Sequence, residues 1–303
     1  MSEQPTRDHV TSVTRRKHGN RSSSHRFTLA VTGNPAVAIG LAMVLSVLLI
    51  AVFAPQLAPH SPTSIQRAAG AFAPVGTEGF VLGTDENARD VLSRVIWGTR
   101  VSLLVAGAAA AIAIVIGTIG GVLTGYLGGS FDNLAMRLID IALSFPSLLL
   151  IIVAVAIMGP GVVNATVVVG FVYAPRVVRI VRSKAIELRG AEYCVAATAL
   201  GASRIRVMVR HILPNVTPTV LIYGSLVFAY GILAESGLSF LGLGAQPPTA
   251  TWGTMLRTGR NFMEFSPGLA VFPGVAIAYS VLAFNLLGDG LRDLLDPRLR
   301  GAH

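Results

Sequence analysis

The sequence predicts an all-α integral membrane protein with six transmembrane helices. Of its 303 residues, 52% are hydrophobic and only 13% are charged, whereas an ordinary soluble domain carries about 25% charged residues. Several windows without any charge are longer than the roughly 20 residues that a helix needs to cross about 30 Å of hydrocarbon. The single cysteine, Cys194, excludes a disulfide framework within the chain. A polytopic membrane protein is therefore favoured over a soluble enzyme.

The charge-free windows place the spans in order along the chain. The first span covers residues 34–54, and its apolar run is longer than the core of a cleaved signal peptide. A helix-breaking Gly159-Pro160-Gly161 tripeptide interrupts the charge-free window between Asp140 and Arg176, which therefore predicts a tight hairpin of two helices. The four windows after the first span lie between Arg100 and Asp132, Asp140 and Arg176, Arg210 and Glu235, and Glu264 and Asp289.

The distribution of lysine and arginine predicts the orientation. With the N-terminus in the cytoplasm, the inner segments carry 18 of these residues and the outer segments carry 6. This excess favours both termini in the cytoplasm and accounts for the net charge of +9 without nucleic acid. The expected organisation is a basic flexible cytoplasmic tail (1–33), the first span (34–54), an extracytoplasmic loop with an amphipathic segment (55–99), a core domain (100–290) and a cytoplasmic tail (291–303).

The residue patterns that bind nucleotides or metals are missing from this sequence. A P-loop needs glycine directly before its lysine, but Lys17 follows Arg16 and Lys184 follows Ser183. No two histidines have the i, i+4 spacing of a helical zinc site, and none lies in a span to activate a serine. We expect a non-catalytic chain that binds no cofactor or metal itself.

The inner segment 187–213 holds the most informative pattern. Tyr193, Ala196, Ala197 and Leu200 recur at helical spacing, and Gly201 is placed to end that helix. The resulting apolar stripe could pack on lipid headgroups or on the chain's own helix ends. It could equally enter a groove on a cytoplasmic partner, and periodicity alone leaves both readings open.

A second amphipathic stretch follows the first. It carries Ile205, Val209 and Ile212 on one side, with arginines on another side. Pro214 then opens the next span, where its missing N–H is harmless.

Segment 187–213 resembles the loop typical of permease subunits in ATP-binding-cassette importers. That pattern is Glu-Ala-Ala, three residues, Gly and, a dozen residues later, an apolar residue before Pro. Val195 stands at the position of the pattern's Glu, and Glu192 lies about one helical turn earlier. The resemblance implies an ATPase-coupling loop formed by Glu192, Ala196, Ala197, Leu200, Gly201, Ala202, Ser203, Ile212 and Pro214.

Further motifs resemble the dipeptide, oligopeptide and nickel permeases. In chain order these are Leu82–Asp85 with Arg89–Arg94 and Gly98–Leu103, Gly125–Gly129 with Phe145-Pro146, Phe240–Pro248 with Trp252-Gly253, and Asn285–Asp293 with Asp296–Arg298. Together they resemble the second, or C-type, permease subunit of such an importer, with the MetI-like fold of type I importers.

The resemblance also implies a function and a set of partners. The chain would form half of a translocation pathway for dipeptides or oligopeptides in the bacterial inner membrane. Its partners would be a second permease subunit, two ATPase subunits that bind ATP and Mg²⁺, and an extracytoplasmic substrate-binding protein. Nickel chelates or glutathione are alternative substrates, and an ion-driven carrier or channel is a more remote alternative.

Polar residues within the predicted spans have two readings. Glu235 and Ser239 lie near the outer end of the fifth span, and Asn285 lies near the inner end of the sixth. Because polar groups in a membrane are costly, they are candidates for the pathway or a gate. The alternative is a structural hydrogen bond to a neighbouring helix. The sequence also predicts an Arg137–Asp140 ion pair, and Trp252 as an anchor on the outer face.

Overall fold

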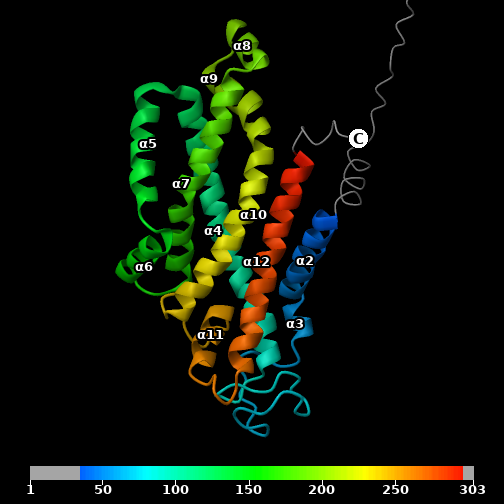
Figure 1. Cartoon of the computed structure of the whole chain (residues 1–303). Helices are drawn as coiled ribbons and strands as arrows, with labels where there is room; N and C mark the ends of the chain where they lie inside the picture. The colour runs from blue at the N-terminus through cyan, green and yellow to red at the C-terminus, as the bar shows by residue number, and fades with distance from the viewer. Residues whose placement is uncertain (1–34, 296–303) are drawn as a thin grey trace, which may run out of the picture.

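The computed structural model describes residues 35–295, and the regular elements in this range are helices (Figure 1). The predicted tail 1–33 and most of the predicted tail 291–303 lie outside the described residues. The all-α prediction is confirmed for the part described. In chain order the elements are α2 (Pro35–Val52), α3 (Ala54–Leu57), α4 (Val91–Leu127), α5 (Gly129–Ser144), α6 (Ser147–Met158), α7 (Val162–Arg189), α8 (Glu192–Ala199), α9 (Arg204–Val207), a π-helical turn (Met208–Ile212), α10 (Leu213–Phe240), α11 (Trp252–Arg260) and α12 (Gly268–Leu295).

Four of the described helices are long and apolar enough to cross a membrane. They are α4, α7, α12 and a continuous helical rod from Arg204 to Phe240 that contains α9 and α10. The bent pair of α5 and α6 makes a fifth candidate if it is counted as one span. α2 is apolar, but its part Ala36–Val52 is shorter than a full span. The described residues thus give four to five candidate spans, and the six-helix count stays a prediction.

The predicted hairpin at Gly159-Pro160-Gly161 is present, but its first arm is not a straight helix. α6 ends at Met158 and α7 begins at Val162. α5 and α6 meet at an angle of 89°, because Phe145 has an extended backbone (φ −92°, ψ 143°), as expected for a residue before proline. The window between Asp140 and Arg176 therefore holds a broken helix followed by a second helix.

α4 begins earlier than the sequence suggested. Its first residue is Val91, inside the predicted loop 55–99, and Asp90 caps it by accepting a hydrogen bond from the Ser93 backbone N–H at 3.0 Å. Arg94 marked this stretch as a loop in the sequence. In the structure it is buried on the helix, 3.3 Å from the carboxylate of Asp85 and 3.0 Å from the Pro62 carbonyl.

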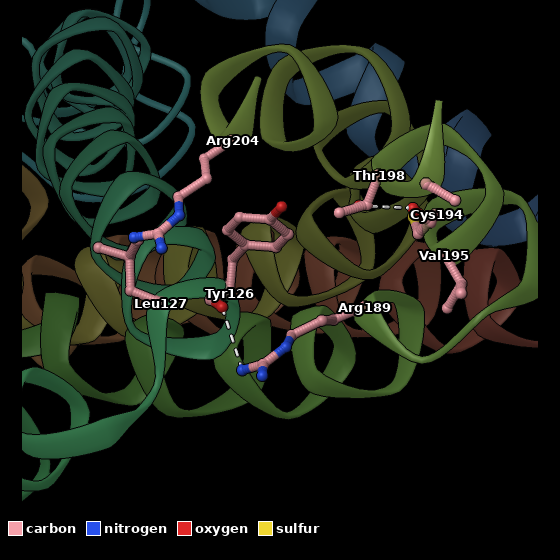
Figure 2. Close-up of a pocket in the computed structure, with 8 residues that line it drawn as sticks. Tyr126, Leu127, Arg189, Cys194, Val195, Thr198 and Arg204 are labelled. Carbon is pink, nitrogen blue, oxygen red and sulfur yellow. Dashed lines mark hydrogen bonds between the residues drawn. The ribbon is translucent and has the colours of Figure 1, made fainter. Parts of the chain in front are cut away.

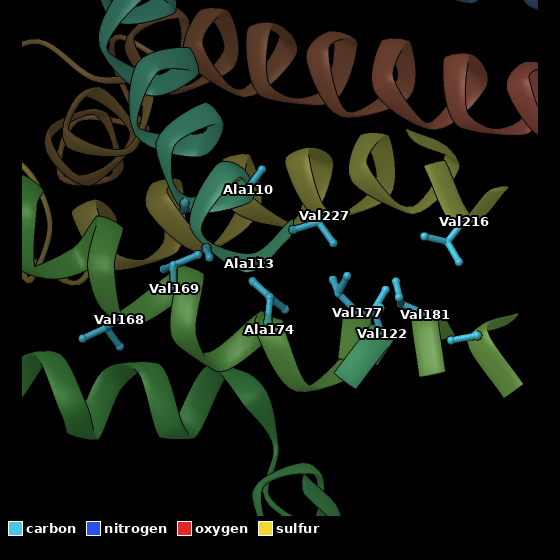
Figure 3. Packing of buried hydrophobic residues seen from close by; sticks show 14 of the residues in the cluster. Ala110, Ala113, Val122, Val168, Val169, Ala174, Val177, Val181, Val216 and Val227 are labelled. Atoms are coloured by element: carbon cyan, nitrogen blue, oxygen red, sulfur yellow. The ribbon is translucent and has the colours of Figure 1, made fainter. Parts of the chain in front are cut away.

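Small residues allow α4 and α7 to pack closely. A Cβ added at Gly117 would lie 2.3 Å from the Cβ of Val177, and one added at Gly121 would lie 2.6 Å from the Cβ of Val181. Alanines and valines of α4, α7 and α10 fill the adjoining core (Figure 3). Membrane helices associate through such close backbone approach, because lipid provides little hydrophobic drive between them.

The two ends of the bundle differ. α8 and α9 lie at one end, and the start of α2 and the end of α12 are directed toward that end (Figure 1). The loop that precedes α4 and the short helix α11 lie at the opposite end. Within residues 35–295, the predicted inner segment 187–213 therefore lies at one end and the predicted outer loop 55–99 lies at the other (Figure 1).

Candidate functional site

α8 ends in a well-formed glycine cap. The Gly201 N–H donates to the Thr198 carbonyl at 3.0 Å, and the Ala202 N–H donates to the Ala197 carbonyl at 3.0 Å. These are the two hydrogen bonds of a Schellman motif, and Gly201 has the positive φ (+85°) that the motif requires. Ala197 and Ala202 both pack against the core of the bundle. The prediction that Gly201 ends this helix is confirmed, and the cap fixes the angle at which the chain leaves α8.

The second amphipathic stretch, residues 205–212, does not bury the apolar side that the sequence predicted. Ile212 is fully buried, but Ile205 and Val209 are exposed by 70% and 57%. The buried side chains beside Ile212 are Val207 and Met208. The stripe was predicted from ordinary α-helical spacing, whereas the chain here forms a π-helical turn, which changes the residue spacing along the face.

Pro214 lies in the first turn of α10, as predicted, directly after the π-helical turn. The start of α10 is not a free helix end, because the helical rod continues through it from Arg204. A proline ring clashes with the carbonyl four residues earlier in a regular α-helix. The π-helical turn lies where this clash would fall. α9 and α10 are consequently one rod that leads from the α8 end into the bundle.

The end of the bundle formed by α8 and α9 exposes large apolar side chains. Leu200 is 89% exposed, and Tyr193 and Val195 are exposed by 44% and 56%. We call Tyr193, Val195, Leu200, Ile205 and Val209 the apolar tip. Grouped exposed apolar side chains mark interaction surfaces. Of the predicted stripe, Ala196 and Leu200 are exposed and Ala197 is half-buried.

The charged and capping residues predicted for the loop lie around the apolar tip. Glu192 is exposed in the first turn of α8, where a carboxylate is favoured by the helix dipole. Ser203 is exposed and caps α9 by accepting a hydrogen bond from the Arg206 N–H at 3.4 Å. Both side chains are therefore accessible to a partner.

A cavity of about 500 Å³ lies beneath α8 (Figure 2). Tyr126 and Leu127 from the end of α4, Arg189 from the end of α7, and Arg204 from α9 contribute to its lining. Arg189 donates a hydrogen bond to the Tyr126 carbonyl at 3.1 Å, which ties α7 to the end of α4. Burial raises the pKa of the Cys194 thiol, whose side chain points to this side of α8.

A polar cluster lies at the opposite end of α10. Glu235 is 3% exposed, and its carboxylate accepts hydrogen bonds from Ser102 of α4 at 2.9 Å and from Ser239 at 2.8 Å. Trp252, at the start of α11, is 1% exposed and donates from its indole N–H to the Val95 carbonyl at 3.2 Å. The prediction of Trp252 as a surface anchor is therefore wrong, because the ring is packed against α4.

Asn285 lies apart from Glu235 and Ser239. Its neighbour Phe284 stacks on Phe228 with ring centroids 4.0 Å apart. Phe228 is seven residues before Glu235 on α10, or about 10 Å along the helix axis. The structure thus brings together two of the three predicted pathway residues and places the third nearer the α8 end.

Ion pairs between α5 and α7 were missed from the sequence. Asp132 accepts two hydrogen bonds from Arg182, at 2.5 and 2.6 Å, and Asp140 pairs with Arg179. The predicted pair of Asp140 with Arg137 is therefore replaced by a contact to the next helix. The spacing of three between Arg179 and Arg182, matched to acids on α5, is the signal that could have revealed these pairs.

A bundle with four to five helices long and apolar enough to cross a membrane defines the described part of the chain as a multi-pass membrane protein. Comparison with known families makes this specific. Residues 113–301 match the family described as binding-protein-dependent transport system inner membrane component. Residues 32–74 match the N-terminal TM domain of oligopeptide transport permease C.

Relatives support the same assignment. The chain is 41% identical to the dipeptide transport system permease protein DppC of Haemophilus influenzae, over 88% of this chain and 92% of the relative. It is 41% identical to the di/tripeptide transport system permease protein DppC of Pseudomonas aeruginosa, over 87% and 88%. It is 43% identical to the glutathione transport system permease protein GsiD of Pectobacterium atrosepticum, over 72% and 73%.

The chain belongs to the family of binding-protein-dependent transport system inner membrane components, and it is a permease subunit of an ATP-binding-cassette importer. The resemblance seen in the sequence is confirmed. As a permease component of a transport system, the chain works together with other subunits.

Proposed function

We propose that this chain forms half of the translocation pathway for small peptides. A second permease subunit would form the other half. Two ATPase subunits would bind ATP and Mg²⁺, and an extracytoplasmic binding protein would deliver substrate. Support for the peptide comes from relatives named for dipeptides and di/tripeptides. Glutathione, itself a peptide and named in one relative, is the second candidate; nickel chelates remain an alternative from sequence resemblance alone.

In this proposal the chain crosses the membrane six times, with both termini in the cytoplasm. α2, the bent pair α5–α6 and the four long helices supply the six crossings. The direction of α2 and α12, whose start and end respectively are turned toward the end that carries α8 and α9, supports this arrangement (Figure 1). The broken α5–α6 pair then crosses in two segments.

The observation that carries the proposal is the apolar tip. Leu200 and Ile205 are exposed by 89% and 70%, although Cys194 of α8 and Val207 of α9 are buried in the core of the bundle. A projection that is anchored by buried side chains and carries an unburied apolar surface suits a subunit that must follow the movement of an ATPase. Coupling requires that this surface binds the two ATPase states with different free energies.

The test is a single charge placed on the apolar tip. Leu200→Asp should abolish co-purification of the ATPase subunits and substrate-stimulated ATP hydrolysis, without loss of membrane insertion. Ile65→Asp is the matched control, because Ile65 is 59% exposed at the opposite end of the bundle. If the tip only touches lipid headgroups, Leu200→Asp will retain the ATPase as well as the control does, and the proposal fails.

Peptide uptake is tested separately. A strain lacking this chain should lose import of di- and tripeptides and regain it with the wild-type chain. Loss of glutathione or nickel-chelate import alone would replace the peptide assignment with the corresponding alternative.

A further inference from the structure

α7 carries an arginine that lacks an acidic partner among residues 35–295. Arg176, Arg179 and Arg182 follow one another at intervals of three, so they lie near one face of the helix. Arg179 and Arg182 pair with Asp140 and Asp132 of α5. Arg176 instead contacts uncharged groups, and its side chain is exposed.

Two aromatic rings and one hydroxyl group surround the guanidinium of Arg176. The guanidinium carbon lies 5.5 Å from the centre of the Tyr173 ring and 5.9 Å from that of Tyr230. These rings come from α7 and α10 and stack on each other 5.8 Å apart. One nitrogen donates to the Ser147 hydroxyl at 2.9 Å. Arginine has five N–H donors in a planar fork, so most of its edge is open for another acceptor.

Two independent features indicate that this face does not meet lipid. Arg176 is 14 residues from the start of α7, or about 21 Å along the helix axis from that end. A charged side chain within a membrane-spanning helix faces protein or water rather than hydrocarbon. The helix break at Phe145-Pro146 directly precedes Ser147, and non-helical backbone at membrane depth is tolerated only inside protein or beside water.

We propose that Arg176, supported by Tyr173, Tyr230 and Ser147, binds the C-terminal carboxylate of the peptide during its passage. This inference rests on the proposed peptide-import function. A guanidinium fork matches a carboxylate with two parallel hydrogen bonds, and aromatic faces leave that edge free. The C-terminal carboxylate is present in every unmodified peptide, so one site serves substrates with different side chains. The contact has to be weak enough to release the peptide.

The test uses the complete importer in proteoliposomes, with its sister permease, ATPases and binding protein. ATP-driven import is measured for dialanine and for an analogue without the carboxylate charge that the wild-type complex also imports, the C-terminal amide or methyl ester of dialanine. Arg176→Gln should lower dialanine import at least about tenfold, as expected when a charge-assisted pair is lost. It should leave import of the amide or ester, which has no carboxylate for Arg176 to bind, within about twofold of wild type. Arg176→Lys should restore part of the dialanine import.

The matched control is Arg179→Gln, one turn further along the same face. Its partner Asp140 belongs to this chain, so any effect should be equal for both substrates. Equal losses for both substrates in Arg176→Gln would instead indicate a structural contact or an acidic partner on the sister permease, and would overturn the carboxylate site. Unchanged dialanine import would overturn it too. A wild-type complex that imports no peptide would refute the proposed function itself.

Discussion

The carboxylate of Glu235 on α10 accepts a hydrogen bond from the Ser102 hydroxyl of α4 at 2.9 Å, across 133 positions of sequence. The second carboxylate oxygen accepts from Ser239 at 2.8 Å. The Ser102 oxygen lies 3.4 Å from the Trp252 backbone nitrogen, which brings α11 into the same cluster. Glu235 therefore joins three helices at the end of the bundle opposite α8.

From these contacts we expect Glu235 to stabilise the helix interface. Glu235→Ala should lower stability by about 1–3 kcal/mol, because it leaves buried hydroxyl groups without an acceptor. Glu235→Gln should cost less and retain transport, since the amide keeps an acceptor oxygen. Thermal aggregation of the detergent-solubilised chain and peptide uptake measure the two effects. A Glu235→Gln chain of full stability that transports nothing would favour a role in the pathway or gate instead.

The sequence predicted features that depend on local chemistry. Gly201 ends α8, and Gly159-Pro160-Gly161 ends α6, because backbone preferences act over a few residues. Partners on other helices could not be predicted in this way. Helical spacing suggested Arg137 for Asp140, but the actual partner, Arg179, is 39 residues away on α7. The burial of Trp252 was likewise not predicted, because it depends on a residue of another helix. Gly98 of α4 has no side chain, and this leaves room for the Trp252 ring.

Close packing of α4 on α7 leads to a second prediction. Gly121→Ala would place a Cβ 2.6 Å from that of Val181 and 2.8 Å from the Val178 carbonyl oxygen. The helices must then separate, and overpacking of this kind costs about 1–3 kcal/mol. The midpoint of thermal unfolding or aggregation in detergent should fall. Gly237→Ala is the control, because no atom lies within 4 Å of its added Cβ. Equal midpoints for both variants would contradict the packing.

The Gly201 cap gives a third prediction. An added Cβ there has nothing within 4 Å, so a substitution is opposed by backbone strain at φ +85° rather than by a clash. A left-handed conformation costs most residues roughly 1–2 kcal/mol, and asparagine tolerates it best. Substrate-stimulated ATP hydrolysis should therefore fall in the order wild type, Gly201→Asn, Gly201→Ala, Gly201→Val. Gly76→Val is the control, because Gly76 has the same φ of +85° and open space around an added Cβ but lies in the loop before α4, at the end of the bundle opposite α8 (Figure 1).

A larger effect is expected when the cap carries a charge beside the apolar tip. Gly201→Asp combines backbone strain with a carboxylate next to Leu200, which is 89% exposed. It should abolish uptake and substrate-stimulated ATP hydrolysis while the chain still inserts into the membrane. Wild-type uptake by this variant would show that the position of α8 is not transmitted to the ATPases.

The buried thiol of Cys194 on α8 leads to a prediction about how its reaction rate depends on pH. Thiol reagents attack the thiolate, and burial raises the pKa of Cys194 and so lowers its thiolate fraction at any given pH. Cys194 in the purified chain should react with a small maleimide much more slowly at pH 7 than Leu200→Cys in a Cys194→Ser background. The rate for Cys194 should also keep rising above pH ~8.5, the ordinary pKa of a thiol, where the rate for the exposed thiol levels off. Equal rates and equal pH profiles would show that α8 opens from the bundle, because Cys194 is only 2% exposed when α8 is packed.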